Sequence, residues 1–286
     1  MNVATGIRRM AVGWLLLLSF SSGSCALDLI SGKKSYNWFS LQDDIKFGQQ
    51  VMEAQRVALL AARPRAVATD TKADAAMYER LKRIVARLAV VSHRPNFPYV
   101  VRLAQLPIVN AWCAPGGQIM VYTGLWDAQH GLVQQRSDDE LAAVLAHEIA
   151  HATARHVTES LTRNMTMALA GSVASSIIAT QSVEGGNLFQ QIFSEGVNVF
   201  IPSYSRRNEL EADRIGLTYM AKAGYDPRTA IVLWERAASR RGAQNSIYAS
   251  HPSSGVRAER LRAYLPEVMP LYEAATRSRA RNGARK

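Results

Sequence analysis

Two histidines and a glutamate in one short stretch have the types and spacing needed to hold and use a metal ion. His147, Glu148 and His151 form an H-E-x-x-H motif within an alanine- and leucine-rich run. Residues four apart lie on one face of a helix, so the two imidazoles can share one ion. Neutral imidazole is a common zinc ligand, and Glu148 can reach a water activated by that metal. The motif therefore predicts a hydrolytic zinc centre, and a chance match on an ordinary helix is the alternative.

The residues around the motif predict the helix that must carry it. Residues 141–156 are mostly strong helix formers. Ser137 precedes them and Glu140 follows three positions later, which is the capping-box pattern. Asp138 and Asp139 suit the positive end of the helix dipole. We therefore expect a helix from about residue 138, with the motif about three turns inside it.

A third ligand must come from elsewhere, because catalytic zinc takes three protein ligands and a water. A continuous helix would place His156 roughly 180° around from His147, so we expect His156 to be partly exposed near the helix end. Glu209 and Asp213 are four apart and share a face of a later predicted helix, whereas Glu211 points elsewhere. Glu209 is the economical third ligand, with Asp213 orienting a ligating histidine. Two acids on a solvated helix face are the alternative, and in isolation the stronger one.

Helices and a small sheet are expected around this centre. Before the motif, apolar spacing predicts two helices, at residues 40–60 and 70–91. It also predicts three short strands, at residues 99–104, 108–112 and 118–123. After the motif it predicts a buried helix at 165–180, a mobile segment at 187–201 and helices from about 205, 226 and 254. The fold class is therefore α+β and mainly α, with a small antiparallel sheet beside the motif helix.

The first 25 residues have the composition of an export signal. Arg8 and Arg9 precede an apolar run, and small residues follow it as far as Cys25. This arrangement resembles a bacterial lipoprotein processing site, and cleavage after Ala26 is the alternative. We expect residues 26–39 to be a polar, irregular tether. The expected location is the bacterial periplasm, with a lipid on Cys25 anchoring the protein in the outer membrane; a soluble periplasmic protein is the alternative.

Composition narrows the classes of function. Apolar residues make up 48% of the 286 residues, enough for a substantial core. The formal net charge of +11 would suit nucleic acid or anionic membranes. No recognisable nucleic-acid module accompanies it, so we expect no nucleic-acid partner. We assign residues 40–270 to one catalytic domain and residues 271–286 to a basic, disordered tail.

Separated motifs in the chain together resemble the HtpX and CaaX-prenyl-protease family of zinc metallopeptidases, metallopeptidase family 48. They are the H-E-x-x-H motif, the segment with Ser205, Arg206, Glu209, Ala212 and Asp213, and the pair His251-Pro252. Asn110-Ala111, Pro115-Gly116-Gly117 and Thr123-Gly124-Leu125 also resemble that family's edge-strand region. The resemblance covers about residues 40–265.

The resemblance implies a gluzincin fold and a set of site residues. It implies one zinc ion held by His147, His151 and Glu209, with Glu148 as catalytic base, Asp213 orienting a ligand and His251 near the zinc. The chain is similar to exported single-domain bacterial members, several of them outer-membrane lipoproteins linked to envelope protein quality control. Prenyl-protein processing is therefore not expected.

Our hypothesis is a zinc endopeptidase that cleaves unfolded or misassembled cell-envelope proteins, bound extended along the edge strand at Asn110. His251, Arg257 or Tyr204 are candidates for stabilising the oxyanion. His251 could instead occupy the open metal position as a latch, or cap the final helix. The alternative function is a zinc-containing, chaperone-like envelope protein that binds without cutting, for which Glu148→Gln would change nothing.

Overall fold

The computed structural model describes residues 24–27, 32, 34–62, 72–134, 137–175, 204–239, 251 and 256–283. The predicted export signal up to residue 23 and the predicted mobile segment at 187–201 lie outside these residues. Among the described helices, none combines the length and the apolar content needed to span a bilayer.

A three-stranded mixed sheet lies at the centre of the fold. Its strands are β3 (Val100–Ala104), β4 (Ala111–Ala114) and β5 (Gln118–Tyr122), with β5 in the middle. The 3-10 turn η1 (Pro115–Gly117) joins β4 to β5 as a hairpin, so this pair is antiparallel as predicted. The pair β3–β5 is parallel, so the prediction of a fully antiparallel sheet was wrong for this pair. The reason is that the chain after β3 crosses to the far side of β5 before β4 begins.

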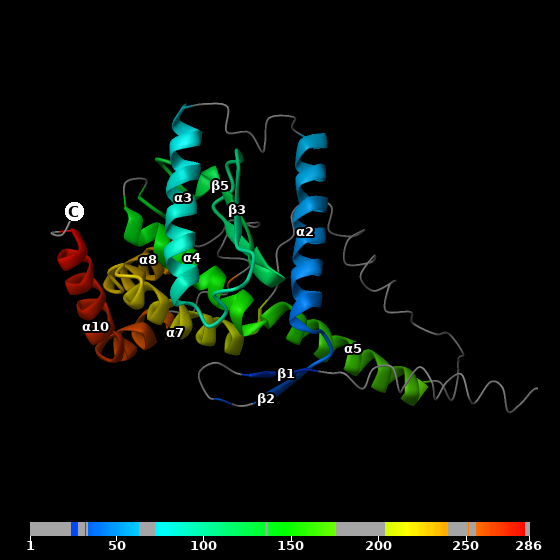
Figure 1. The fold of residues 1–286 in the computed structure, drawn as a ribbon. Coiled ribbons are helices and arrows are strands. Elements are labelled where there is room, and N and C mark those ends of the chain that lie inside the picture. The colour runs from blue at the N-terminus through cyan, green and yellow to red at the C-terminus, as the bar shows by residue number, and fades with distance from the viewer. Residues whose placement is uncertain are drawn as a thin grey trace, which may run out of the picture.

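Two helices cover the opposite faces of this sheet (Figure 1). They are α2 (Leu41–Ala62) and α3 (Lys72–Val91), both predicted from apolar spacing. Side chains alternate along β5, so Met120 packs with α2 residues while Ile119 packs in the cluster that contains α3. Gly48 lets α2 approach the turn η1, because an added Cβ would lie 1.8 Å from the carbonyl oxygen of Pro115.

The motif helix α4 (Asp138–Ala154) is buried beneath the sheet and α3. Ser137 caps it, since its hydroxyl oxygen accepts a hydrogen bond from the Glu140 backbone N–H at 3.1 Å. Every residue from Glu140 to Ala154 is buried, which confirms the predicted helix and its place in the core. The helix ends at Arg155, whose φ of 64° is left-handed.

The next helix, α5 (His156–Ser175), begins directly after this break. It therefore starts nine residues before the predicted helix at 165–180. Met167 is 67% exposed, so the described part of α5 is not wholly buried as predicted. Residues 176–180 lie outside the described part of the chain.

Three further helices follow, of which the first two pack on α4 and the third packs on both of them. They are α7 (Arg206–Lys222), α8 (Arg228–Ser239) and α10 (Val256–Gly283). Ser205 and Asn208 form a capping box at the start of α7. Gly216 brings α7 close to α4, because an added Cβ would lie 3.1 Å from the backbone of Ala146 and His147. This close approach brings the acidic face of α7 to the motif.

The C-terminal tail is helical, which corrects the predicted disorder of residues 271–286 as far as Gly283. Helix α10 continues through Pro266 and Pro270. Arg279 donates a hydrogen bond to the carbonyl oxygen of Gly224 at 3.0 Å, and Tyr272 packs against the core. Tertiary contacts therefore stabilise a segment whose composition suggested a solvated end.

The predicted tether is also more ordered than its composition suggested. Strands β1 (Ser24–Leu27) and β2 (Lys34–Asn37) form an antiparallel pair instead of an irregular chain. Asn37 is fully buried, and its Nδ2 donates to the hydroxyl of Thr158 on α5 at 3.0 Å. This contact holds β2 against α5.

Candidate metal centre

Four side chains bring metal-binding atoms to one buried point. They are His147 and His151 of α4, Glu209 of α7, and His251, whose ligand atoms all lie within 4.8 Å of one another. The Nε2 atoms of His147 and His151 are 3.1 Å apart. The carboxylate of Glu209 lies 3.4 Å from Nε2 of His147 and 3.3 Å from Nε2 of His151. The two histidines and Glu209 are thus brought together as the sequence predicted.

The spacing of these atoms fits a tetrahedral metal ion. Zinc at about 2.0–2.1 Å from each ligand atom separates those atoms by about 3.3 Å. The observed separations of 3.1 to 3.4 Å match that value. Two imidazoles and a carboxylate are a donor set typical of zinc, in the arrangement of a gluzincin metalloprotease. The fit of the chain to a metal ion therefore rests on its own geometry.

The electrostatics of the centre favour added positive charge. Burial by itself lowers the pKa of His251, but the carboxylates of Glu209 and Glu148 outweigh it and raise that pKa to about 10. Burial raises the pKa of Glu209, and the neighbouring histidines reverse this effect and lower it. Burial holds the pKa of His151 well below its usual value, so this imidazole stays neutral. A neutral imidazole beside a charged carboxylate is the state that binds a cation.

Asp213 lies behind the first histidine, where the sequence analysis expected it. Its Oδ1 is 3.0 Å from Nδ1 of His147, and its Oδ2 accepts from Nε of Arg257 at 2.7 Å. Burial raises the pKa of Asp213, and the charge of Arg257 outweighs burial and lowers it. The carboxylate therefore stays charged and holds a proton on Nδ1 of His147, leaving Nε2 to face the centre.

Glu148 lies beside the centre with neither carboxylate oxygen in a hydrogen bond to a described residue. The residue is fully buried. Nε2 of His251 lies 3.3 Å from Oε1 of Glu148, at an ion-pair distance. A buried carboxylate without a hydrogen-bond donor is costly, so Glu148 is ready to accept a proton from a group that enters the centre.

His251 lies among the ligand atoms themselves. Its Nδ1 is 3.2 Å from Nε2 of His147 and 2.9 Å from Oε1 of Glu209. Both ring nitrogens therefore face the centre, and the helix-capping alternative does not describe this residue. The geometry suits a fourth ligand as well as a donor that moves onto a substrate.

The two other oxyanion candidates have different surroundings. Arg257 is 2% exposed, its Nη1 lies 3.1 Å from Oε2 of Glu209, and its guanidinium lies 3.7 Å from the ring centroid of Trp234. It therefore stabilises the carboxylates of Glu209 and Asp213. Tyr204 stacks on His151 with ring centroids 3.6 Å apart, and its buried hydroxyl has no hydrogen-bond partner among the described residues. Tyr204 keeps an available donor at the centre.

The expectation for His156 was wrong. His156 is fully buried, and its Nδ1 lies 2.9 Å from Nδ1 of His151. On a continuous helix His156 would face away from His147, but the left-handed Arg155 ends α4 and changes the direction of the next residue. Arginine is not a residue that signals such a break, so the sequence offered no local warning.

Comparison with known proteins agrees with this centre. Residues 75–265 match the profile of peptidase family M48. Mitochondrial metalloendopeptidase OMA1 of Schizosaccharomyces pombe is 34% identical over 200 residues, which are 68% of this chain and 55% of that protein. The Arabidopsis thaliana protein of the same name is 35% identical over 174 residues, 60% of this chain and 33% of that protein.

A bacterial relative is more distant. A putative beta-barrel assembly-enhancing protease of Vibrio cholerae is 29% identical over 156 residues, 54% of this chain and 31% of that protein. The chain thus spans between about a third and just over half of the length of these curated relatives. The match over most of the chain and the donor set on α4 and α7 lead to one conclusion: the chain belongs to peptidase family M48 and carries the metallopeptidase domain of that family.

Proposed function

We propose that this chain is a zinc-dependent endopeptidase that cleaves unfolded or misassembled cell-envelope proteins. The observation that carries the proposal is the buried Glu148 carboxylate, whose oxygens have no hydrogen-bond partner among the described residues, beside a donor set for zinc. Family membership and the relatives named as metalloendopeptidases support the reaction class. The Vibrio cholerae protein named for beta-barrel assembly supports a substrate in the envelope.

The mechanism assigns each buried group a task. Zinc, when bound, supplies a Lewis acid that polarises the scissile carbonyl and makes an attacking water more acidic. Glu148 takes a proton from that water and later delivers it to the leaving amine. Asp213 keeps the proton of His147 on Nδ1, 3.0 Å away, so that Nε2 remains a lone-pair donor. Tyr204, whose hydroxyl has no hydrogen-bond partner among the described residues, donates to the developing oxyanion.

Substrate binds as an added strand along β4. This strand pairs only with β5 among the described strands, so its other edge can offer backbone groups to an extended peptide. Asn110, just before β4, has a buried Nδ2 without a hydrogen-bond partner among the described residues, and this donor could meet a substrate carbonyl. Pairing through backbone groups would select for unfolded segments more than for sequence.

His251 has two roles that the proposal keeps open. As a latch it would hold the metal ion through Nδ1, from its present position beside Nε2 of His147 and Oε1 of Glu209. As a catalytic group it leaves that position and stabilises the oxyanion. Replacement by alanine separates them, because cleavage rises if His251 is a latch and falls if it is needed in the transition state.

The proposed location is the bacterial periplasm, with a lipid on Cys25 anchoring the protein in the outer membrane. The signal-like composition of the first 25 residues supports this proposal. Incorporation of a labelled fatty acid into the wild type but not into Cys25→Ala, with outer-membrane fractionation, is the expected result. A mature protein that begins at Leu27 and carries no lipid would favour the soluble alternative.

The experiment that tests the function pairs zinc content with cleavage of an unfolded protein such as casein. We expect one zinc per chain in both the wild type and Glu148→Gln, and cleavage only by the wild type. Zinc without cleavage by either the wild type or the His251→Ala variant would favour the chaperone-like alternative. A Glu148→Gln variant that cleaves would overturn the mechanism, and absence of zinc would overturn the site.

A further inference from the structure

We propose that His156 and Glu211 position the ligand His151 through a relay of one hydrogen bond and one charge contact, so that the metal affinity of the centre depends on both. The inference rests on the proposed zinc site. It concerns residues for which neither the motif nor the mechanism above has a role.

The relay begins at the outer nitrogen of His151. Its Nε2 faces Nε2 of His147 at 3.1 Å and Oε1 of Glu209 at 3.3 Å, so this nitrogen is the metal-binding one. A neutral imidazole with a lone pair on Nε2 carries its proton on Nδ1. Nδ1 of His151 lies 2.9 Å from Nδ1 of His156. Because Nδ1 of His151 carries the proton, it donates the hydrogen bond and Nδ1 of His156 accepts it.

The tautomer of His156 then follows. Because its Nδ1 accepts, the proton of a neutral His156 resides on Nε2. This nitrogen lies at an ion-pair distance of 3.5 Å from Oε2 of Glu211 and makes no hydrogen bond to any described residue. Glu211 therefore favours the one tautomer of His156 that can accept from His151. The relay thus runs from the metal-binding Nε2 of His151 through the two imidazole rings to the carboxylate of Glu211.

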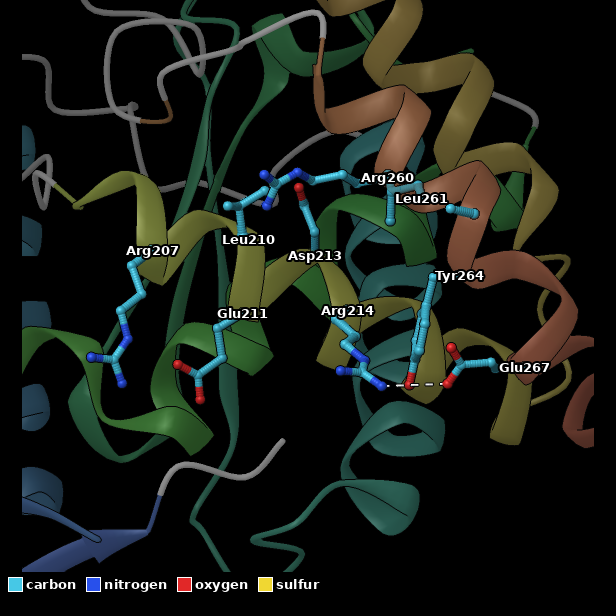
Figure 2. A pocket seen from close by; sticks show the side chains of 10 residues that line it. Arg207, Leu210, Glu211, Asp213, Arg214, Arg260, Leu261, Tyr264 and Glu267 are labelled. Carbon is cyan, nitrogen blue, oxygen red and sulfur yellow. Dashed lines mark hydrogen bonds and ion pairs between the residues drawn. The ribbon is translucent and has the colours of Figure 1, made fainter. Parts of the chain in front are cut away.

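The two metal-binding histidines are thus oriented by different means. His147 contacts the carboxylate of Asp213 directly at 3.0 Å. His151 reaches the carboxylate of Glu211 only through His156. Figure 2 shows Asp213 and Glu211 projecting from α7 in different directions, which lets one helix supply both carboxylates. Glu211 is 10% exposed and also lines a hollow of about 440 Å³ between α7 and α10 (Figure 2).

The backbone break at Arg155 makes the relay possible. On an unbroken helix His156 would lie about 140° around from His151, and the two rings could not meet edge to edge. In the structure their ring planes stand at 74° with centroids 5.0 Å apart. The break therefore has a consequence for the metal centre as well as for the chain path.

The test measures zinc affinity on the full purified chain by competition with a chromophoric chelator. His156→Leu removes the acceptor and should weaken zinc binding about 10–100-fold, the usual effect of losing such a partner. His156→Asn should restore most of the affinity, because asparagine Oδ1 stands two bonds from Cβ, as Nδ1 of histidine does. His93→Leu is the matched control. Its imidazole bonds the Tyr219 hydroxyl at 2.7 Å and makes no hydrogen bond to a candidate ligand in the described part of the chain, so its loss should leave zinc affinity unchanged.

Glu211 provides a second, independent variant. Glu211→Ala alone should weaken zinc binding, and the double variant with His156→Leu should bind no more weakly than His156→Leu alone. This non-additivity is expected because Glu211 acts only through His156. The melting temperature of each metal-free variant verifies folding at the assay temperature.

The outcomes distinguish the relay from the proposed function. A His156→Leu chain that binds zinc as tightly as the wild type overturns the relay alone. Equal weakening of zinc binding by His156→Leu and His156→Asn also overturns the relay, since lost packing would explain it. Additive effects of the His156 and Glu211 changes overturn it as well, since the charge of Glu211 would then act independently of His156. A wild-type chain that binds no zinc overturns the proposed function and the relay together.

Discussion

The buried ion pair between Arg155 and Asp44 supports the sharpest prediction about stability. Arg155 is 3% exposed and Asp44 is 1% exposed. Nε of Arg155 lies 2.5 Å from Oδ2 of Asp44, and its Nη2 lies 3.2 Å from Oδ1. The same Nη2 donates to the carbonyl oxygens of Phe39 and Ser40. The pair thus fixes the start of α2 to the break between α4 and α5.

Removing one partner should cost far more than a surface salt bridge does. Burial raises the pKa of Asp44, although Arg155 opposes this effect, so the ionised carboxylate is tolerated only while it is paired. Leaving one buried charge alone costs about 3–5 kcal/mol. At roughly 2–4 °C for each kcal/mol in a domain of this size, Asp44→Ala should lower the melting temperature by about 6–20 °C.

A double-mutant cycle isolates the pair. Urea unfolding of metal-free Asp44→Ala, Arg155→Ala and the double variant should show that the double costs clearly less than the sum of the singles. Arg155→Gly is the matched control, because glycine accepts φ of 64° and should be about 1–2 kcal/mol more stable than Arg155→Ala. Single variants within about 1 kcal/mol of the wild type, a value typical of surface pairs, would refute the reasoning.

Three further predictions address the cap, the metal and acid stability. Ser137→Ala should destabilise the protein by about 1 kcal/mol in urea unfolding, since it removes the cap of α4. Chelation should lower the melting temperature, and zinc at a thousand times its Kd should raise the free energy of unfolding by about 4.1 kcal/mol. Glu209→Ala should lose this response to zinc, whereas Glu148→Gln should keep it. Hydrogen bonds from Arg228 lower the pKa of Asp226 in the folded protein. The ionised Asp226 therefore stabilises the fold at pH values above the ordinary pKa of aspartate, and this stabilisation is lost as the pH falls through the lowered pKa of the folded state. Asp226→Asn should therefore lose less stability on acidification, measured by urea midpoints, and an unchanged acid profile would contradict this assignment.

The elements that depend on neighbouring residues could be predicted. Helix α4 has its cap at Ser137, its acidic first turn and its apolar content within one short stretch, so its start and burial follow from the sequence. Helices α2 and α3 and strand β5 follow in the same way from spacing. The pairing of His147 with His151 needs only the pitch of a helix.

Elements that depend on distant residues could not be predicted. Strand β2 is held by the contact of Asn37 with Thr158, 121 positions away, and the C-terminal end of α10 by Arg279 on Gly224. The parallel pairing of β3 depends on which side of β5 the chain crosses. In each case the stabilising partner is remote in sequence, so composition alone suggested an irregular or solvated chain.

The sequence by itself determined the ligand-bearing face of α4 and the spacing of Glu209 and Asp213, because helical geometry fixes which side chains share a face. Only the tertiary structure decided that His156 turns inward to His151, that Glu211 stands behind it and that Arg257 supports Asp213. The physical reason is that one left-handed residue, stabilised by a buried ion pair more than a hundred positions away, changes the direction of everything after it.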